Sequence, residues 1–148
     1  MMAGAPLRGK GYAIVCVDRQ GTACAIEAPC PLLQVRRPAN PHGHVNCTND
    51  YQLSHLADAD RRTPEGKANA IARRELLDRL LQQPGDTSAE GMKAVLRRHR
   101  TNDAPAICRH AGPDEGFTEY SMIGLPQSGR VLFYHGTPCE GTYEAVCI

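Results

Sequence analysis

The residues best placed to take part in chemistry lie between positions 44 and 51, where the sequence reads His-Val-Asn-Cys-Thr-Asn-Asp-Tyr. This stretch follows a run of strand-like segments and precedes a long segment with helical spacing. A polar pair between an apolar segment and a helix is a good position for a hydrogen-bond donor that faces a reacting group. We therefore take Asn49 as the first candidate functional residue, with Thr48, Asp50 and Tyr51 beside it.

Composition restricts the classes of partner. The chain has 148 residues, the size of one ordinary domain, and its 41% hydrophobic and 22% charged content is typical of a soluble globular protein. The net charge of +1 provides no strong field for nucleic acid or anionic lipid. Two Phe, five Tyr and no Trp provide no stacking platform for single strands. We expect no nucleic-acid partner.

The cellular setting is predicted from the N-terminus and the cysteines. Residues 1–10 lack the apolar core of a signal peptide, and we expect them to be a disordered or leader segment. No segment approaches the roughly 20 apolar residues of a membrane span. Seven cysteines occur, an odd number without a C-x-x-C pair, and most lie in apolar segments as small hydrophobic residues. The sequence therefore predicts a cytoplasmic protein with reduced thiols and no membrane partner.

The pattern of apolar residues predicts strands, then two helices, then strands again. The run 11–17 is almost continuously apolar, which suits a strand covered on both faces. Turn residues at 18–21 and 126–129 predict hairpins. The other strands are expected over residues 22–27, 32–37, 44–47, 105–109, 117–125, 131–134 and 143–148.

Two helices are expected between these groups of strands. Apolar residues recur at helical spacing from about Lys67 to Leu81, and Pro84-Gly85 should stop this helix. Thr87 and Glu90 are spaced as a capping box that begins the second. Because hairpin connections dominate, we expect an α+β fold with a largely antiparallel sheet and two main helices on one face.

The order and spacing of several short motifs resemble a known family. They are Glu27-Ala28-Pro29, Arg37-Pro38, Thr48-Asn49-Asp50-Tyr51, Pro105-Ala106-Ile107-Cys108-Arg109-His110, Gly129-Arg130-Val131-Leu132 and Gly136-Thr137-Pro138-Cys139. Together they look like the C-terminal half of the acyl-coenzyme A:6-aminopenicillanic-acid acyltransferase (isopenicillin N acyltransferase-like) family. That family groups cysteine-dependent N-terminal nucleophile hydrolases. The resemblance covers residues 11–148.

The resemblance implies part of a four-layer α/β/β/α fold. An enzyme of this kind cuts its own precursor to expose an N-terminal Cys, whose thiolate attacks a small-molecule acyl amide or thioester. The acyl group then passes to water or to an amine, and no cofactor or metal is implied. Thr48 to Tyr51 match a Thr-Asn-His-Phe-like motif, so Asn49 is the expected catalytic oxyanion donor, worth about 3 kcal/mol in the transition state. Thr48, Asp50 and Tyr51 are the expected substrate-binding residues.

Three departures from the family pattern limit what the chain could do alone. Asp50 replaces the His of the motif and adds negative charge near the oxyanion position. Asp114, Glu115 and Gly116 stand where the penicillin-type member has a substrate-binding Arg. No Cys follows the Gly-Cys-Thr or Gly-Cys-Ser pattern of the nucleophile. We therefore expect a catalytically incomplete C-terminal portion that needs a nucleophile-bearing N-terminal segment or subunit. The alternative is a non-catalytic α+β binding or interaction domain derived from that scaffold.

Other candidate sites compete with simpler structural roles. Cys108 and His110 would share one face of a strand and could form a papain-like pair, although a core Cys beside a surface His explains them as well. Arg73 could pair with Asp60 or Glu75, contact substrate or remain a solvated helix charge. A zinc site is conceivable, although paired close ligands are missing, in the first third of the chain at Cys24, Cys30, His42, His44, Cys47 and His55.

Overall fold

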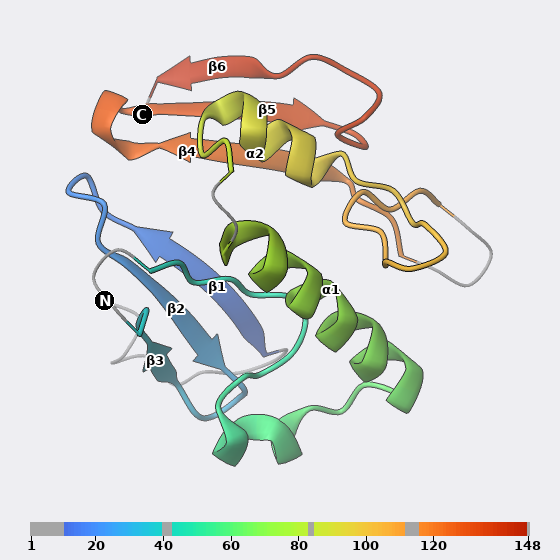
Figure 1. Cartoon of the computed structure of the whole chain (residues 1–148). Coiled ribbons are helices and arrows are strands. Elements are labelled where there is room, and N and C mark those ends of the chain that lie inside the picture. Colours follow the sequence, from blue (N-terminus) through green and yellow to red (C-terminus); the bar gives the residue numbers. More distant parts are fainter. Residues whose placement is uncertain (1–10, 40–42, 83–84, 112–115, 148) are drawn as a thin grey trace. The chain divides into compact units, whose positions relative to one another are not determined.

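The structure, a computed structural model, describes residues 11–39, 43–82, 85–111 and 116–147 (Figure 1). The chain forms two compact units, Met1–Glu75 and Leu76–Ile148. Each unit contains a three-stranded antiparallel sheet, and the described residues also form two main helices. The prediction of an α+β, antiparallel fold is thus confirmed at this level. The prediction for residues 1–10 lies outside the described part of the chain.

The sheet of the first unit begins with the predicted hairpin. Asp18 closes the turn, because its Oδ1 accepts the backbone N–H groups of Gln20 and Thr22 at 2.9 and 2.8 Å. Gly21 has φ +87°, which glycine adopts without steric strain. The strands lie in the order β1-β2-β3, with bounds Tyr12–Val17, Ala23–Ala28 and Gln34–Arg36.

The prediction that the first strand is covered on both faces is wrong. β1 is an edge strand, and five of its six residues are exposed. A continuous apolar run cannot distinguish a buried strand from an uncovered edge strand, because both need β-forming side chains. The large apolar residues that β1 exposes are Tyr12, Ile14, Val15 and Val17.

The predicted strand at residues 44–47 is also wrong, because this segment is irregular. Its backbone bonds to side chains and not to a neighbouring strand. Arg36 Nη2 and Gln52 Nε2 donate to the Asn46 carbonyl oxygen at 2.7 and 2.9 Å. A short 3-10 helix, η2 (Ser54–Ala59), follows.

Helix α1 (Pro64–Gln82) begins earlier than expected and runs across the boundary between the units. Pro64 is its first residue, and the Thr63 hydroxyl accepts the N–H of Gly66 at 3.2 Å as a cap. Its end at Gln82 agrees with the predicted stop at residues 84–85, of which Pro84 lies outside the described residues.

Helix α2 (Ala89–Leu96) is capped by Ser88, one residue after the predicted Thr87. Ser88 Oγ accepts the N–H of Gly91 at 3.3 Å, and Asp86 Oδ1 accepts the N–H of Ser88 at 2.8 Å. The Asp86 carboxylate therefore orders Ser88, the residue that caps the helix. The Thr87–Glu90 spacing in the sequence does not indicate this arrangement.

The second unit contains the sheet β4-β5-β6, with α2 packed against β4 (Figure 1). The predicted turn at 126–129 is confirmed: it forms a 3-10 turn, η3 (Pro126–Ser128), followed by Gly129 at φ +61°. The predicted strand over 117–125 begins only at residue 120. The strand bounds are Tyr120–Leu125, Arg130–His135 and Glu144–Cys147.

The predicted strand at 105–109 is wrong. The N–H groups of Ile107 and Cys108 both donate to the Arg98 carbonyl oxygen at 2.9 Å, so this segment folds back on the end of α2. A single bridge between Thr101 and Ala104 closes the tip of the loop.

Both units have small cores. Their buried hydrophobic residues are Ala25, Ala28, Leu56 and Ala70 in the first unit and Leu76, Cys108, Ile123 and Tyr143 in the second.

Among the described residues, neither helix has the length and apolarity that crossing a lipid bilayer requires.

Candidate functional site

Asn49 lies on an exposed loop with its carboxamide oriented by α1. Arg73 Nη2 donates to Asn49 Oδ1 at 2.7 Å, and Arg73 Nε donates to Asn69 Oδ1 at 3.0 Å. An arginine has only donors, so the contact identifies which end of the Asn49 amide is oxygen. The Nδ2 group then points away from Arg73 and has no acceptor among the described residues. Arg73 thus contacts two asparagines that the sequence did not indicate, and its pairing with Asp60 or Glu75 stays a prediction.

Asp50 is buried, and its negative charge is paired. Arg74 Nε donates to Asp50 Oδ2 at 2.8 Å. The Thr48 hydroxyl lies 2.5 Å from Asp50 Oδ1 and 2.9 Å from the Ala70 carbonyl oxygen. The charge that replaces the motif His is therefore neutralised by α1. The Thr48 hydroxyl and the Asp50 carboxylate are engaged within the protein, and their role in binding a substrate stays a prediction.

Tyr51 packs against the start of the first sheet. A Cβ atom built on Gly11 would lie 2.1 Å from the Tyr51 hydroxyl oxygen, so the tyrosine hydroxyl occupies the space beside this glycine. Burial, followed by the nearby Asp60 carboxylate, raises the pKa of Tyr51 above its ordinary value. Its role as a substrate contact also stays a prediction.

Sequence reasoning missed the polar cluster that holds this loop. The fully buried Glu27 accepts from Arg36 Nε at 3.0 Å through Oε1. Its Oε2 accepts the N–H groups of Gln52 and Leu53 at 2.8 and 3.1 Å. We call Glu27, Arg36, Asn46 and Gln52 the carboxylate network. The signal available in the sequence was an acidic residue at an inward-facing position of an otherwise apolar strand.

The papain-like pair is not activated in this structure. Cys108 Sγ lies 3.9 Å from His110 Nε2, and the thiol is almost fully buried whereas His110 is exposed. Burial raises the pKa of the Cys108 thiol to about 11, which opposes thiolate formation. A buried Cys beside a surface His, the simpler interpretation, is what the structure contains.

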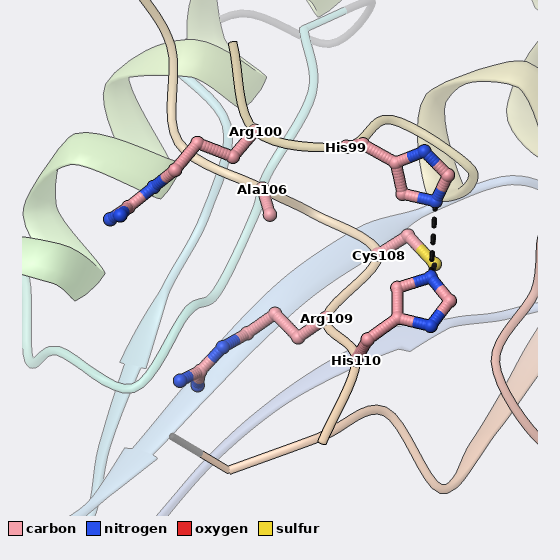
Figure 2. A pocket seen from close by; sticks show the side chains of 6 residues that line it. All are labelled: His99, Arg100, Ala106, Cys108, Arg109 and His110. Carbon is pink, nitrogen blue, oxygen red and sulfur yellow. Dashed lines mark hydrogen bonds between the residues drawn. The ribbon is translucent and has the colours of Figure 1, made fainter. Parts of the chain in front are cut away.

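Cys108 and His110 belong to a larger group. The ligand atoms of His99, Cys108, His110 and Cys139 all lie within 4.8 Å of one another. We call these four residues the thiol–imidazole cluster. Figure 2 shows the Nε2 atoms of His99 and His110 pointing toward each other, with the Cys108 sulfur beside the line that joins them. Arg100 and Arg109 line the same hollow, of about 380 Å³, but their side chains extend away from the cluster (Figure 2).

Local structure holds the four side chains in place. His99 and Cys108 flank the loop that folds back onto Arg98. Cys139 lies in the segment after β5, where Arg97 donates to the carbonyl oxygens of Pro138 and Gly141 at 2.8 and 3.0 Å. A Cβ atom at Gly141 would lie 2.1 Å from the Tyr134 ring, so this segment packs tightly on the sheet.

The zinc candidates of the first third of the chain that the structure describes, Cys24, Cys30, His44, Cys47 and His55, do not converge on one point. Among the described residues, the thiol–imidazole cluster is the one group of three or more His, Cys, Asp or Glu whose ligand atoms converge. His42 lies outside those residues, as do Asp114 and Glu115. The sequence signal for the observed cluster was the short Cys108-x-His110 spacing with His99 nearby, whereas the fourth member, Cys139, is distant in sequence.

The chain matches no protein-family model, no curated protein and no solved structure.

Proposed function

We propose that this chain is the C-terminal portion of a cysteine-dependent amide hydrolase or acyltransferase of the N-terminal nucleophile class, built as part of an α/β/β/α fold. Asn49 donates its Nδ2–H to the oxygen that becomes negative when a Cys from another segment or subunit attacks an acyl amide or thioester. The observation that carries the proposal is the contact from Arg73 to Asn49 Oδ1, which turns the donor end of the amide outward.

Two further observations support this function. Asp50 is buried and paired with Arg74, so its charge does not oppose an oxyanion beside Asn49. β1 is an apolar edge strand, as expected of a sheet that adds strands from a missing part of the enzyme.

The test is to express the chain together with the coding sequence immediately upstream of it. We expect cleavage before a Cys and the appearance of activity on acyl p-nitroanilides or acyl thioesters. Asn49→Ala should lower kcat by about 10²- to 10³-fold, as removal of one oxyanion donor does. Asn69→Ala is the matched control, since it also removes an Arg73 contact but leaves Asn49 in place. Equal losses in the two variants, or no activity with any upstream segment, would contradict the proposal.

A second candidate is a non-catalytic α+β binding or interaction domain. The observation that favours it is that Asn49 is an exposed loop residue and lines neither the hollow at residues 99–110 nor the hollow between His110 and Glu140, both in the second unit. Thermal unfolding of the isolated chain distinguishes the two candidate functions. A half-enzyme with uncovered apolar strands should be marginally stable and prone to aggregate, whereas a self-sufficient domain should unfold sharply as a monomer at high temperature.

A further inference from the structure

We infer that the thiol–imidazole cluster is a tetrahedral site for Zn²⁺, with His99 Nε2, Cys108 Sγ, His110 Nε2 and Cys139 Sγ as its four ligands. Two thiolates and two neutral imidazoles are a ligand set that zinc prefers, and together with Zn²⁺ they form a group without net charge. This inference is independent of the proposed function.

Four of the six distances between ligand atoms agree with tetrahedral geometry, and all six are within 4.8 Å. Usual Zn–S and Zn–N bonds place two sulfurs about 3.8 Å apart, two nitrogens about 3.3 Å apart and a sulfur and a nitrogen about 3.6 Å apart. Here the two sulfurs are 3.6 Å apart and the two nitrogens 3.2 Å apart. His110 Nε2 lies 3.3 Å from Cys139 Sγ and 3.9 Å from Cys108 Sγ.

Hydrogen bonding alone accounts poorly for this convergence. His110 Nε2 has three polar neighbours within 3.9 Å, namely His99 Nε2 and the two sulfurs. A ring nitrogen has one in-plane direction and makes one good hydrogen bond, as donor or as acceptor according to tautomer. A cation at the centre of the four atoms would use every lone pair at once.

A carboxylate contacts the ring nitrogen of His110 that faces away from the cluster, as is usual for metal-binding histidines. His110 Nδ1 lies 3.4 Å from Glu140 Oε1, while the Thr137 hydroxyl donates to the other oxygen of that carboxylate. Such a partner favours the tautomer whose proton is on Nδ1, so that the Nε2 lone pair faces the metal. Glu140 is thus a positioning residue in the proposed site.

The role of the ion follows from the number of ligands. With four protein ligands no position remains for water or substrate, so the site is structural. Zinc would tie the loop after α2 to the segment after β5, because three ligands come from residues 99–110 and the fourth is Cys139. Since His99 and His110 are exposed, the ion can enter from solvent.

The test uses the full chain, purified with a thiol reductant and freed of metal by chelation. We expect one Zn²⁺ per chain by native mass spectrometry, and Zn K-edge absorption with two sulfur and two nitrogen ligands. Co²⁺ should give the intense visible bands of a tetrahedral ion and a thiolate charge-transfer band. These measurements need no variant, so a variant that fails to fold does not decide the result. Absence of binding, an ion coordinated only by oxygen and nitrogen, or a Cys108–Cys139 disulfide that persists in the presence of the reductant would overturn the inference.

Variants then assign the ligands. Cys108→Ser and His99→Gln should each weaken zinc binding by at least about 100-fold, and Glu140→Gln by about 10-fold. Cys147→Ser and His135→Gln are matched controls, because both residues are exposed, lie in the same unit and are outside the cluster. An equal loss of affinity in the controls would contradict the assignment.

Discussion

The carboxylate network and the thiol–imidazole cluster are built from different kinds of groups. In the carboxylate network, the acceptors of Glu27 face the guanidinium of Arg36 and backbone N–H donors. In the thiol–imidazole cluster, four atoms with lone pairs face one another. Donors and acceptors are matched in the first cluster, so it is complete without a ligand. The second needs an electrophile to bring its lone pairs together.

This difference assigns the clusters different tasks. The carboxylate network holds residues 46–53 against the first sheet and so determines where Asn49 projects. The thiol–imidazole cluster joins two segments of the second unit that are distant in sequence. Stability in the first unit should therefore respond to single side chains of the network, and stability in the second to the supply of metal.

The largest effect is expected from a substitution that breaks the carboxylate network. Glu27→Ala leaves the Arg36 guanidinium partly buried without its partner and orphans two backbone N–H groups, so we expect a loss of about 3–5 kcal/mol in the free energy of unfolding. Urea unfolding measures the loss, and hydrogen exchange should show it in β2 and residues 46–53. Glu65→Ala, at an exposed position of α1, is the control. A loss below about 1 kcal/mol would show that the network is not what holds the loop.

The features that could be predicted from the sequence are local ones. Both hairpin turns depend on neighbouring residues, as with Asp18 and Gly21, and α1 is evident from its spacing. The Arg73–Asn49 contact joins residues that lie in separate elements, and the thiol–imidazole cluster joins residues 99–110 to Cys139, which follows β4 and β5. Such convergence depends on how irregular segments fold back, which their apolar pattern does not encode. The predicted strands at 44–47 and 105–109 failed for the same reason: their backbones bond to side chains and to the Arg98 carbonyl.

A smaller effect is expected in the second unit, where it tests whether the thiol–imidazole cluster depends on its neighbours. Arg97→Ala removes two hydrogen bonds from a charged donor to the segment that carries Cys139, so we expect a loss of about 1.5–3 kcal/mol in unfolding free energy. Zinc affinity should fall with it, because Cys139 is then less well placed. Calorimetry and zinc titration measure the two effects. Arg98→Ala removes an exposed side chain from the next position and should change neither. A stability loss without any change in zinc affinity would separate the Arg97 contacts from the cluster.

The smallest expected effect tests an ion pair of the first unit outside the carboxylate network. Arg62 donates to Asp60 through Nε at 3.0 Å and Nη2 at 2.6 Å, and these bonds lower the pKa of the Asp60 carboxyl below its ordinary value of 3.8. A carboxyl with a lowered folded-state pKa stabilises the fold above the unfolded-state value, and this contribution disappears as the pH falls through the folded-state pKa. Asp60→Asn should therefore cost about 1 kcal/mol at neutral pH and nothing at a pH below both values. Urea unfolding of wild type and variant across that range measures the difference, with the exposed Asp58→Asn as control. A cost that did not change with pH would mean that Asp60 acts through packing and that its charge does not stabilise the first unit.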